Sequence, residues 1–213
     1  MDSTRLIAST LTQVAKPPRV LISASAIGYY GDRGEEILHE ESAPGHGFLA
    51  DVCRNWEAAC EPARAAGLRV VHLRIGVVLG KGGGALGSML TQFRLGVGGR
   101  IGDGRQYWSW VTLADVAGAV HHALANESLR GAVNVVAPGA VRNAEFTRVL
   151  GRVLGRPTLL PMPALAARLA LGEMADALLL ASTRVEPRRL TASGFRFQHR
   201  DLEGALHDVL GRS

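Results

Sequence analysis

Residues 20–32, VLISASAIGYYGD, constrain the fold of this chain more than any other stretch. A short apolar run with β-branched residues follows Pro17 and Pro18 and ends near Gly28, which is typical of a buried strand in a parallel sheet. In open α/β sheets the ligand crevice lies beyond the carboxyl ends of the strands. We therefore expect the polar side chains of this stretch to face such a crevice. These side chains are Ser23, Ser25, Tyr29 and Tyr30.

The segments around this stretch alternate between helical and extended patterns. Residues 3–15 and 48–66 have the apolar period of helices, and Gly67 stops the second one. Residues 69–79 give a strand followed by a second extended run, whereas residues 31–47 are polar and rich in turn formers, which indicates a long surface loop. A strand, a helix and a strand of these lengths predict a βαβ unit and hence a parallel sheet.

The second half continues the alternation and then changes composition. Residues 80–84, GKGGG, favour a flexible turn, because the spacing and hydroxyl residue of a phosphate-binding P-loop are absent. Further elements are expected at 85–95 (helix), 107–111 (strand), from Leu113 with Thr112 as its cap (helix), 132–137 (strand), 143–154 (helix) and 201–210 (helix).

The fold class expected from these patterns is α/β. Residues 1–156 should form a partial Rossmann-like parallel sheet with helices on both faces. Residues 157–213, which are rich in Leu and Ala and then in Arg, should form a mostly helical C-terminal cap over the open end of the sheet.

Charge and composition limit the kinds of partner and ligand expected for this chain. The formal net charge is +5, but the arginines are spread along the chain without a basic block, so nucleic-acid binding is not expected. No apolar run is long enough to span a bilayer, and the first residues lack a signal peptide, so we expect no membrane association. Cys53 and Cys60, about 10 Å apart on one helix, are too distant for a disulfide and lack zinc-ligand spacing. These features predict a reduced, cytoplasmic protein without a metal.

Five stretches taken together resemble a known superfamily. They are SASAIGYYG, LRIGVVLGKGGGAL, GDGRQYWSWVTLADVAGAVHHAL, VNVVAPGAVRNAEF and PRRLTASGFRF. Their order over the whole chain resembles the extended short-chain dehydrogenase/reductase superfamily, in its epimerase-like branch with a short C-terminal helical domain. The resemblance implies NADP(H) as cofactor and an oxidoreductase or epimerase role on a small carbonyl or hydroxyl substrate, or on a nucleotide-linked one.

Members of that branch open with a strand and a glycine-rich loop of the GGTGFIG type, which holds the pyrophosphate at a helix N-terminus. Nothing of that kind occurs in this chain. We therefore expect the first third of the family domain to be absent, by truncation or as a reduced descendant, and cofactor recognition to be incomplete. The sheet surface left exposed predicts self-association.

The superfamily's chemistry uses a tyrosine, a lysine four residues later and a serine. The lysines of this chain are Lys16 and Lys81, preceded at that spacing by Thr and Val, so no YxxxK pair exists. The matching helix has Leu49 and Cys53 instead, with Glu57 four residues after Cys53. The catalytic candidates that remain are Ser25, which matches the serine, and Tyr29 or Tyr30 from the turn.

A tyrosine without a neighbouring cation keeps a pKa near 10 and is a poor base at neutral pH. Arg54 could supply charge, but it would point about 100° away from the lysine position on its helix.

Arg74 stands near the carboxyl end of an apolar strand, where a buried charge needs a partner. Two partners remain open: the cofactor, as the resemblance implies, or a carboxylate such as Asp115 or Glu57. The cofactor contacts implied by the resemblance are Arg74, Gly76 and Val77, with Ser23 nearby.

Arg105 and Trp108 resemble positions where sugar-nucleotide enzymes hold substrate. Asp115 suits the dipole at the start of its helix, and Asn143 and Glu145 are interpreted as cap and first-turn residues. A small-molecule substrate is therefore one hypothesis. A noncatalytic module that binds a nucleotide or a protein partner is the other.

Overall fold

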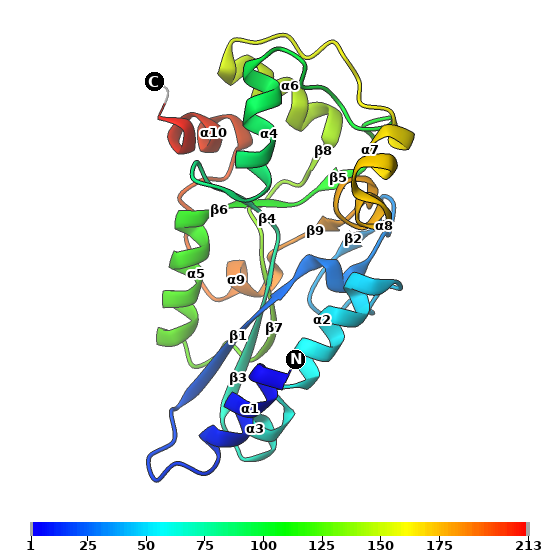
Figure 1. The fold of residues 1–213 in the computed structure, drawn as a ribbon. Helices are drawn as coiled ribbons and strands as arrows, with labels where there is room; N and C mark the ends of the chain where they lie inside the picture. Colours follow the sequence, from blue (N-terminus) through cyan, green and yellow to red (C-terminus); the bar gives the residue numbers. More distant parts are fainter. Residues whose placement is uncertain (1, 212–213) are drawn as a thin grey trace.

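The computed structural model describes residues 2–211 of the chain. Three parallel strands form its central sheet in the order β1-β3-β7. They are β1 (Val20–Ala26), β3 (Arg69–Ile75) and β7 (Gly131–Val135). Helix α5 (Leu113–Ala125) lies on one side of the sheet, and α1 (Asp2–Leu11), α2 (Phe48–Ala58) and α3 (Glu61–Ala65) lie on the other (Figure 1). The Rossmann-like α/β class predicted from the sequence is confirmed.

Alternate side chains of β3 explain why helices cover both faces, because successive residues of a strand point to opposite sides. Val71 and Leu73 belong to an apolar core with α5. Val70 points the other way and packs with residues of α1 and α3. That second face becomes polar toward the carboxyl ends of the strands, where His72 and Arg74 replace apolar residues.

The remaining elements surround this sheet. They are the 3₁₀ turn η1 (Ile27–Tyr30), β2 (Ile37–Leu38), β4 (Val77–Leu79), α4 (Gly84–Arg94), β5 (Tyr107–Trp108), β6 (Trp110–Thr112), β8 (Val141–Arg142), α6 (Asn143–Leu154), α7 (Ala164–Leu171), α8 (Glu173–Ala175), the π-helical turn η2 (Asp176–Leu180), β9 (Arg184–Val185), α9 (Arg188–Ala192) and α10 (Leu202–Leu210). Short pairs link β4 with β6, β5 with β8 and β2 with β9.

The C-terminal segment is threaded through the rest of the molecule. From α7 and α8 it returns toward the central sheet: β9 pairs in parallel with β2 in a separate two-stranded sheet, and α9 packs against β7. It then leaves again, and α10 packs against α6 (Figure 1). Residues from both sides of the predicted boundary at 156 share one apolar core, for example Phe146 with Leu206. The division into two domains stays a prediction.

Several predicted elements have different limits in the structure. The helix expected over 48–66 is two helices, because the chain turns at Ala59 and Cys60 and Pro62 starts the second one without an N–H to donate. The strand expected over 107–111 is interrupted at Ser109, whose carbonyl oxygen accepts from Val77 N–H at 2.8 Å. The first helix ends at Leu11 rather than near residue 15.

Other local predictions are confirmed. Helix α6 has the predicted limits and ends at Leu154, and the next residue, Gly155, adopts a left-handed conformation with φ of 64°. Thr112 caps α5, because its side-chain oxygen accepts from the N–H of Asp115. Both cysteines are free and buried. Among the described residues, no helix has the length and apolar character needed to cross a bilayer.

Candidate functional site

A row of three polar residues crosses the sheet near the carboxyl ends of its strands. The register pairs Ser25 of β1 with Arg74 of β3, and Arg74 with Asn134 of β7. All three are buried, with exposed fractions of 4%, 3% and 0%. Register partners point to the same side of a sheet, so the three side chains line one face beside α2 and η1. Because buried polar groups need partners, this row organises the residues around it.

Arg74 has partners for its guanidinium on three sides. Its Nε and Nη2 donate to the two carboxylate oxygens of Glu57, both at 2.8 Å, and its Nη1 donates to the Tyr30 hydroxyl at 3.0 Å and to the Glu40 carbonyl at 3.3 Å. Burial alone would lower the pKa of Arg74, but the hydrogen bonds and charges of Glu57 and Tyr30 together outweigh it and the pKa is raised. Of the two carboxylates proposed from the sequence, Glu57 is the partner in the structure.

The two adjacent tyrosines have different environments. Tyr30 is fully buried, and its hydroxyl donates to Asn134 Oδ1 at 2.7 Å while accepting from Arg74. Burial, against the opposing effect of Arg74, raises the pKa of Tyr30. Tyr29 is half-buried, and the Arg74 guanidinium lies 3.4 Å from its ring centroid. Its hydroxyl makes no hydrogen bond to the described residues, so it remains available to a ligand.

The cation beside the tyrosines is therefore Arg74, whereas the sequence offered only Arg54. Arg54 instead pairs with Asp51 on the exposed side of α2.

The Ser25 hydroxyl donates to Glu57 Oε1 at 2.9 Å. Ser25 thus belongs to the same network as Arg74 and the tyrosines, and all three predicted catalytic residues lie together. Cys53, at a position matched to the superfamily's pair, is buried beside this serine, and burial is the main cause that raises the pKa of its thiol. A proton-transfer role for Ser25, Tyr29 or Tyr30 stays a prediction.

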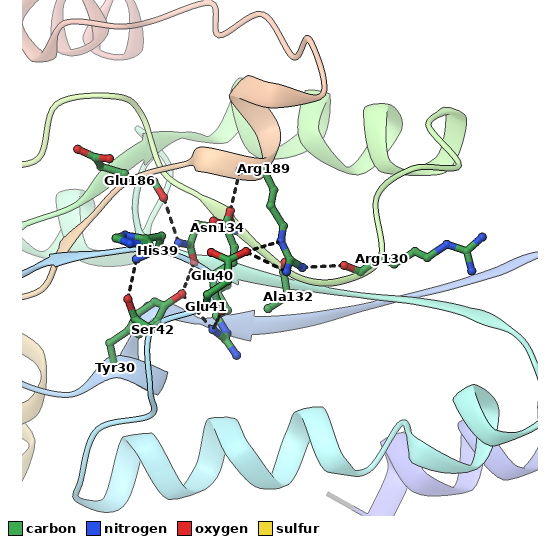
Figure 2. Close-up of polar contacts among 11 residues, drawn as sticks. Tyr30, His39, Glu40, Glu41, Ser42, Arg130, Ala132, Asn134, Glu186 and Arg189 are labelled. Atoms are coloured by element: carbon green, nitrogen blue, oxygen red, sulfur yellow. Dashed lines mark hydrogen bonds and ion pairs between the residues drawn. The ribbon is translucent and has the colours of Figure 1, made fainter.

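Glu40 lies beside Asn134 and Arg189, between β7 and the C-terminal segment (Figure 2). It is 6% exposed, and its Oε1 accepts from the backbone N–H groups of Asn134 and Arg189, each at 3.1 Å. Asn134 Nδ2 donates to the Glu186 carbonyl at 3.0 Å. The loop carboxylate and the strand amide therefore attach the C-terminal segment to β7.

The sequence analysis missed both residues at the centre of this attachment. Asn134 could have been detected from the sequence, because it is a polar residue within the apolar run of residues 132–137. Glu40 left none beyond its place in an acidic loop.

The predicted cofactor contacts are only partly free to bind a ligand. The N–H groups of Gly76 and Val77 donate to Val135 and Ser109 carbonyls at 3.1 and 2.8 Å. A Cβ on Gly76 would lie 2.5 Å from the Ser109 carbonyl oxygen, so this glycine serves close packing. Ser23 is half-buried, and its hydroxyl contacts the next carbonyl oxygen at 3.3 Å and also the Cys60 thiol.

The predicted substrate residues lie apart from the polar row. Trp108 is 5% exposed, packs at 5.2 Å between ring centroids against Phe146, and lines a cavity of about 210 Å³. Arg105 is exposed and does not line that cavity.

Two other residues singled out in the sequence have structural contacts. The cap predicted for Asn143 is wrong, because the N-cap of α6 is Arg142 and the Asn143 side chain instead accepts from Ile101 N–H at 2.8 Å. Asp115 accepts from the N–H groups of Gln198 and His199, which anchors the C-terminal segment to the start of α5.

The parallel sheet flanked by helices, with a serine, an arginine and two tyrosines at its carboxyl edge, defines a Rossmann-like protein of the short-chain dehydrogenase and epimerase class. The chain is 41% identical over 214 residues to epimerase family protein SDR39U1 of Mus musculus, covering 99% of this chain and 72% of that protein. It belongs to this SDR39U1 epimerase family.

Further comparisons agree with that family. Epimerase family protein Mb2239 of Mycobacterium bovis is 46% identical over 186 residues, which are 87% of this chain and 62% of that protein, so the chain spans about three fifths of this relative. The crystal structure of human SDR39U1 (isoform 2) with NADPH superposes with a TM-score of 0.94 at 35% identity, covering 100% of this chain and 72% of that one. A family model described as a domain of unknown function (DUF1731) matches residues 162–209.

Proposed function

We propose that this chain provides the nicotinamide side of an NADP(H)-dependent, epimerase-like oxidoreductase that acts on a small carbonyl or hydroxyl compound or a nucleotide-linked one. The observation that carries the proposal is the buried Ser25–Arg74–Asn134 row at the carboxyl edge of the parallel sheet, with the Tyr29 ring beside it. Ligands of open α/β sheets bind at this edge. The human relative that superposes on the whole chain was crystallised with NADPH, which supports the choice of cofactor.

The groups with hydrogen-bonding capacity to spare fit a polar ligand at this edge. They are the Tyr29 hydroxyl and the Ser23 hydroxyl, together with the outer backbone edge of β1, which pairs with no strand among the described residues. Arg74 and the N–H groups of Gly76 and Val77 already have protein partners, so they would shape the site rather than hold the cofactor. When bound, the cofactor supplies or accepts a hydride.

The residues of this chain have separable roles in the proposed reaction. Glu57 holds Arg74, and Arg74 fixes the plane of the Tyr29 ring. Ser25 donates to Glu57, so its oxygen can still accept a hydrogen bond. The half-buried Tyr29 hydroxyl is the group that can exchange a proton with a substrate oxygen, in place of the tyrosine that the superfamily carries on the helix.

A fluorescence titration tests the proposal with two ligands. NADPH reports the whole cofactor, and reduced nicotinamide mononucleotide isolates the nicotinamide end. Both should show saturable enhancement of nicotinamide fluorescence with this chain. Tyr29→Phe keeps the ring over Arg74 and should keep binding, but it should abolish NADPH-dependent reduction of any ketone that the unaltered chain reduces. Tyr107→Phe is the matched control. Failure of both ligands to bind would refute the proposal.

A noncatalytic nucleotide-binding module is the second candidate. It is favoured by one observation, that the Ser25 and Tyr30 hydroxyls both donate their protons to protein acceptors in a chain without a YxxxK pair. Saturable NADPH binding with no turnover over a broad panel of ketones and alcohols would favour this candidate. NADPH consumption that depends on Tyr29 would exclude it.

A further inference from the structure

An apolar pocket lies away from the polar row, between α4 and α6. It has a volume of about 210 Å³. Trp108 and Phe146 are buried at its base, and Phe93 of α4 forms a wall. Val97 and Leu160, which are 53% and 58% exposed, lie at its mouth. The pocket is therefore open at one side and closed by aromatic rings at the other.

The mouth of the pocket is held by two segments that run side by side. Ile101 and Met162 form an isolated parallel bridge, and Met162 N–H donates to the Arg100 carbonyl at 2.8 Å. A Cβ on Gly99 would lie 1.7 Å from the carbonyl oxygen of Leu160, so only glycine allows the two segments to come this close. The opening is thus part of a fixed backbone arrangement.

The lining contains no charged side chain. A nucleoside diphosphate group requires cations or clustered N–H donors to offset its charge. The pocket instead offers aromatic rings, methionine side chains and aliphatic side chains. Its chemistry fits an uncharged group.

Two buried polar side chains face this apolar lining. Asn143 and Thr147 are 1% and 4% exposed, and they lie four residues apart on the same face of α6. Asn143 Oδ1 is used by the N–H of Ile101, whereas its Nδ2 makes no hydrogen bond to the described residues, and neither does the Thr147 hydroxyl. Both side chains line the pocket, and neither donor is among the fully buried atoms without a partner, so a ligand that offers an acceptor can reach and satisfy them.

We infer that this pocket binds a compact, uncharged, mainly apolar group that carries one hydrogen-bond acceptor such as a ketone oxygen. A cavity of about 150 Å³ in another protein holds benzene, so this larger one suits a benzene ring with a short substituent. The inference rests on the proposed function in one respect, that the bound group belongs to the substrate. Because the pocket lies away from the polar row, this group is a part of the substrate other than the oxygen that meets Tyr29. The pocket selects a substrate with such an apolar part over a sugar nucleotide.

Three probes test the class of ligand by isothermal titration calorimetry with the full 213-residue chain: acetophenone, ethylbenzene and UDP-glucose. Acetophenone should bind. Ethylbenzene lacks the acceptor, and its affinity should be lower by about threefold to tenfold, the worth of one hydrogen bond. UDP-glucose should neither bind this pocket nor compete with acetophenone. Absence of acetophenone binding at millimolar concentration, or competition by UDP-glucose, overturns the inference.

A pair of variants tests whether acetophenone binds in this pocket. Leu160→Trp adds a ring at the mouth of the pocket, whereas Leu159→Trp adds the same ring at a neighbour that is 84% exposed and does not line the pocket. Leu160→Trp should weaken acetophenone binding by about tenfold or more, and Leu159→Trp should leave it within about twofold. Equal affinities in the two variants overturn the inference.

An NADPH titration of the same variants separates this inference from the proposed function. Both variants should bind NADPH like the unaltered chain. Acetophenone binding without NADPH binding would leave the pocket in place and refute the proposed function, and the reverse result would refute the pocket alone.

Discussion

Loss of the Glu57 charge should destabilise the fold far more than loss of a surface carboxylate. The side chains of Arg74 and Glu57 are 4% and 14% exposed, and two hydrogen bonds of 2.8 Å join them. Removal of one partner from a buried pair costs about 3–5 kcal/mol, mainly because the other charge stays buried without compensation. The Gln side chain keeps one acceptor oxygen, and position 57 is partly exposed. We therefore expect Glu57→Gln to lower the free energy of unfolding by about 3 kcal/mol, the lower end of that range.

Urea denaturation followed by circular dichroism measures this loss. Glu61→Gln is the control, because Glu61 pairs with Arg64 on the exposed surface, with exposed fractions of 54% and 70%. The control should leave the free energy of unfolding unchanged within error. The double variant Glu57→Leu with Arg74→Met should be less destabilised than the sum of its single changes, because it leaves no orphaned charge. A Glu57→Gln loss below about 1 kcal/mol, as for surface pairs, would refute the reasoning.

Four further predictions concern pH, packing, reactivity and association. Burial lowers the pKa of His72 from 6.5, so the folded state prefers the neutral ring and the free energy of unfolding should fall as pH drops below that value. In the His72→Gln variant, the urea midpoint should change less between neutral and acid pH than in the unaltered chain. Gly99→Ala should lower the free energy of unfolding by about 2 kcal/mol or more, because its Cβ would strike a backbone carbonyl. Gly87→Ala, in open space on α4, should raise it by up to about 1 kcal/mol, and thermal denaturation of the two variants measures both changes. Cys53 and Cys60, whose thiol pKa values are raised chiefly by burial, should react with iodoacetamide only in urea, as intact mass would show. The outer edge of β1, unpaired among the described residues, should give association that light scattering detects as concentration rises, and a monomer at all concentrations would contradict this.

The sheet and its main helices could be predicted because their signals are local. The apolar run of β1 and the helical period of α6 extend over whole elements, and the α6 limits matched to the residue. The β2–β9 pair could not be predicted. It joins Ile37 and Leu38 to Arg184 and Val185, and two residues are too few to show a strand period. Its register depends on where the C-terminal segment returns to the sheet.

The candidate site was predictable only as far as the strand ends. Ser25, Arg74 and the tyrosines follow from the rule that ligands bind at the carboxyl edge, and they do lie together. Which carboxylate neutralises Arg74 was open, because the choice between Glu57 and Asp115 depends on how α2 and α5 pack.

The adjacent tyrosines show why the remaining assignment needs the structure. Residues 29 and 30 are identical in type, and both contact the same guanidinium. Tyr30 points inward, where its hydroxyl donates to Asn134 and accepts from Arg74, and burial raises its pKa. Tyr29 is half-buried, with the face of its ring against the cation and its hydroxyl without a hydrogen bond to the described residues. A phenol that transfers a proton must be reachable, so the role proposed above falls to Tyr29, whereas Tyr30 joins Arg74 to Asn134 of β7.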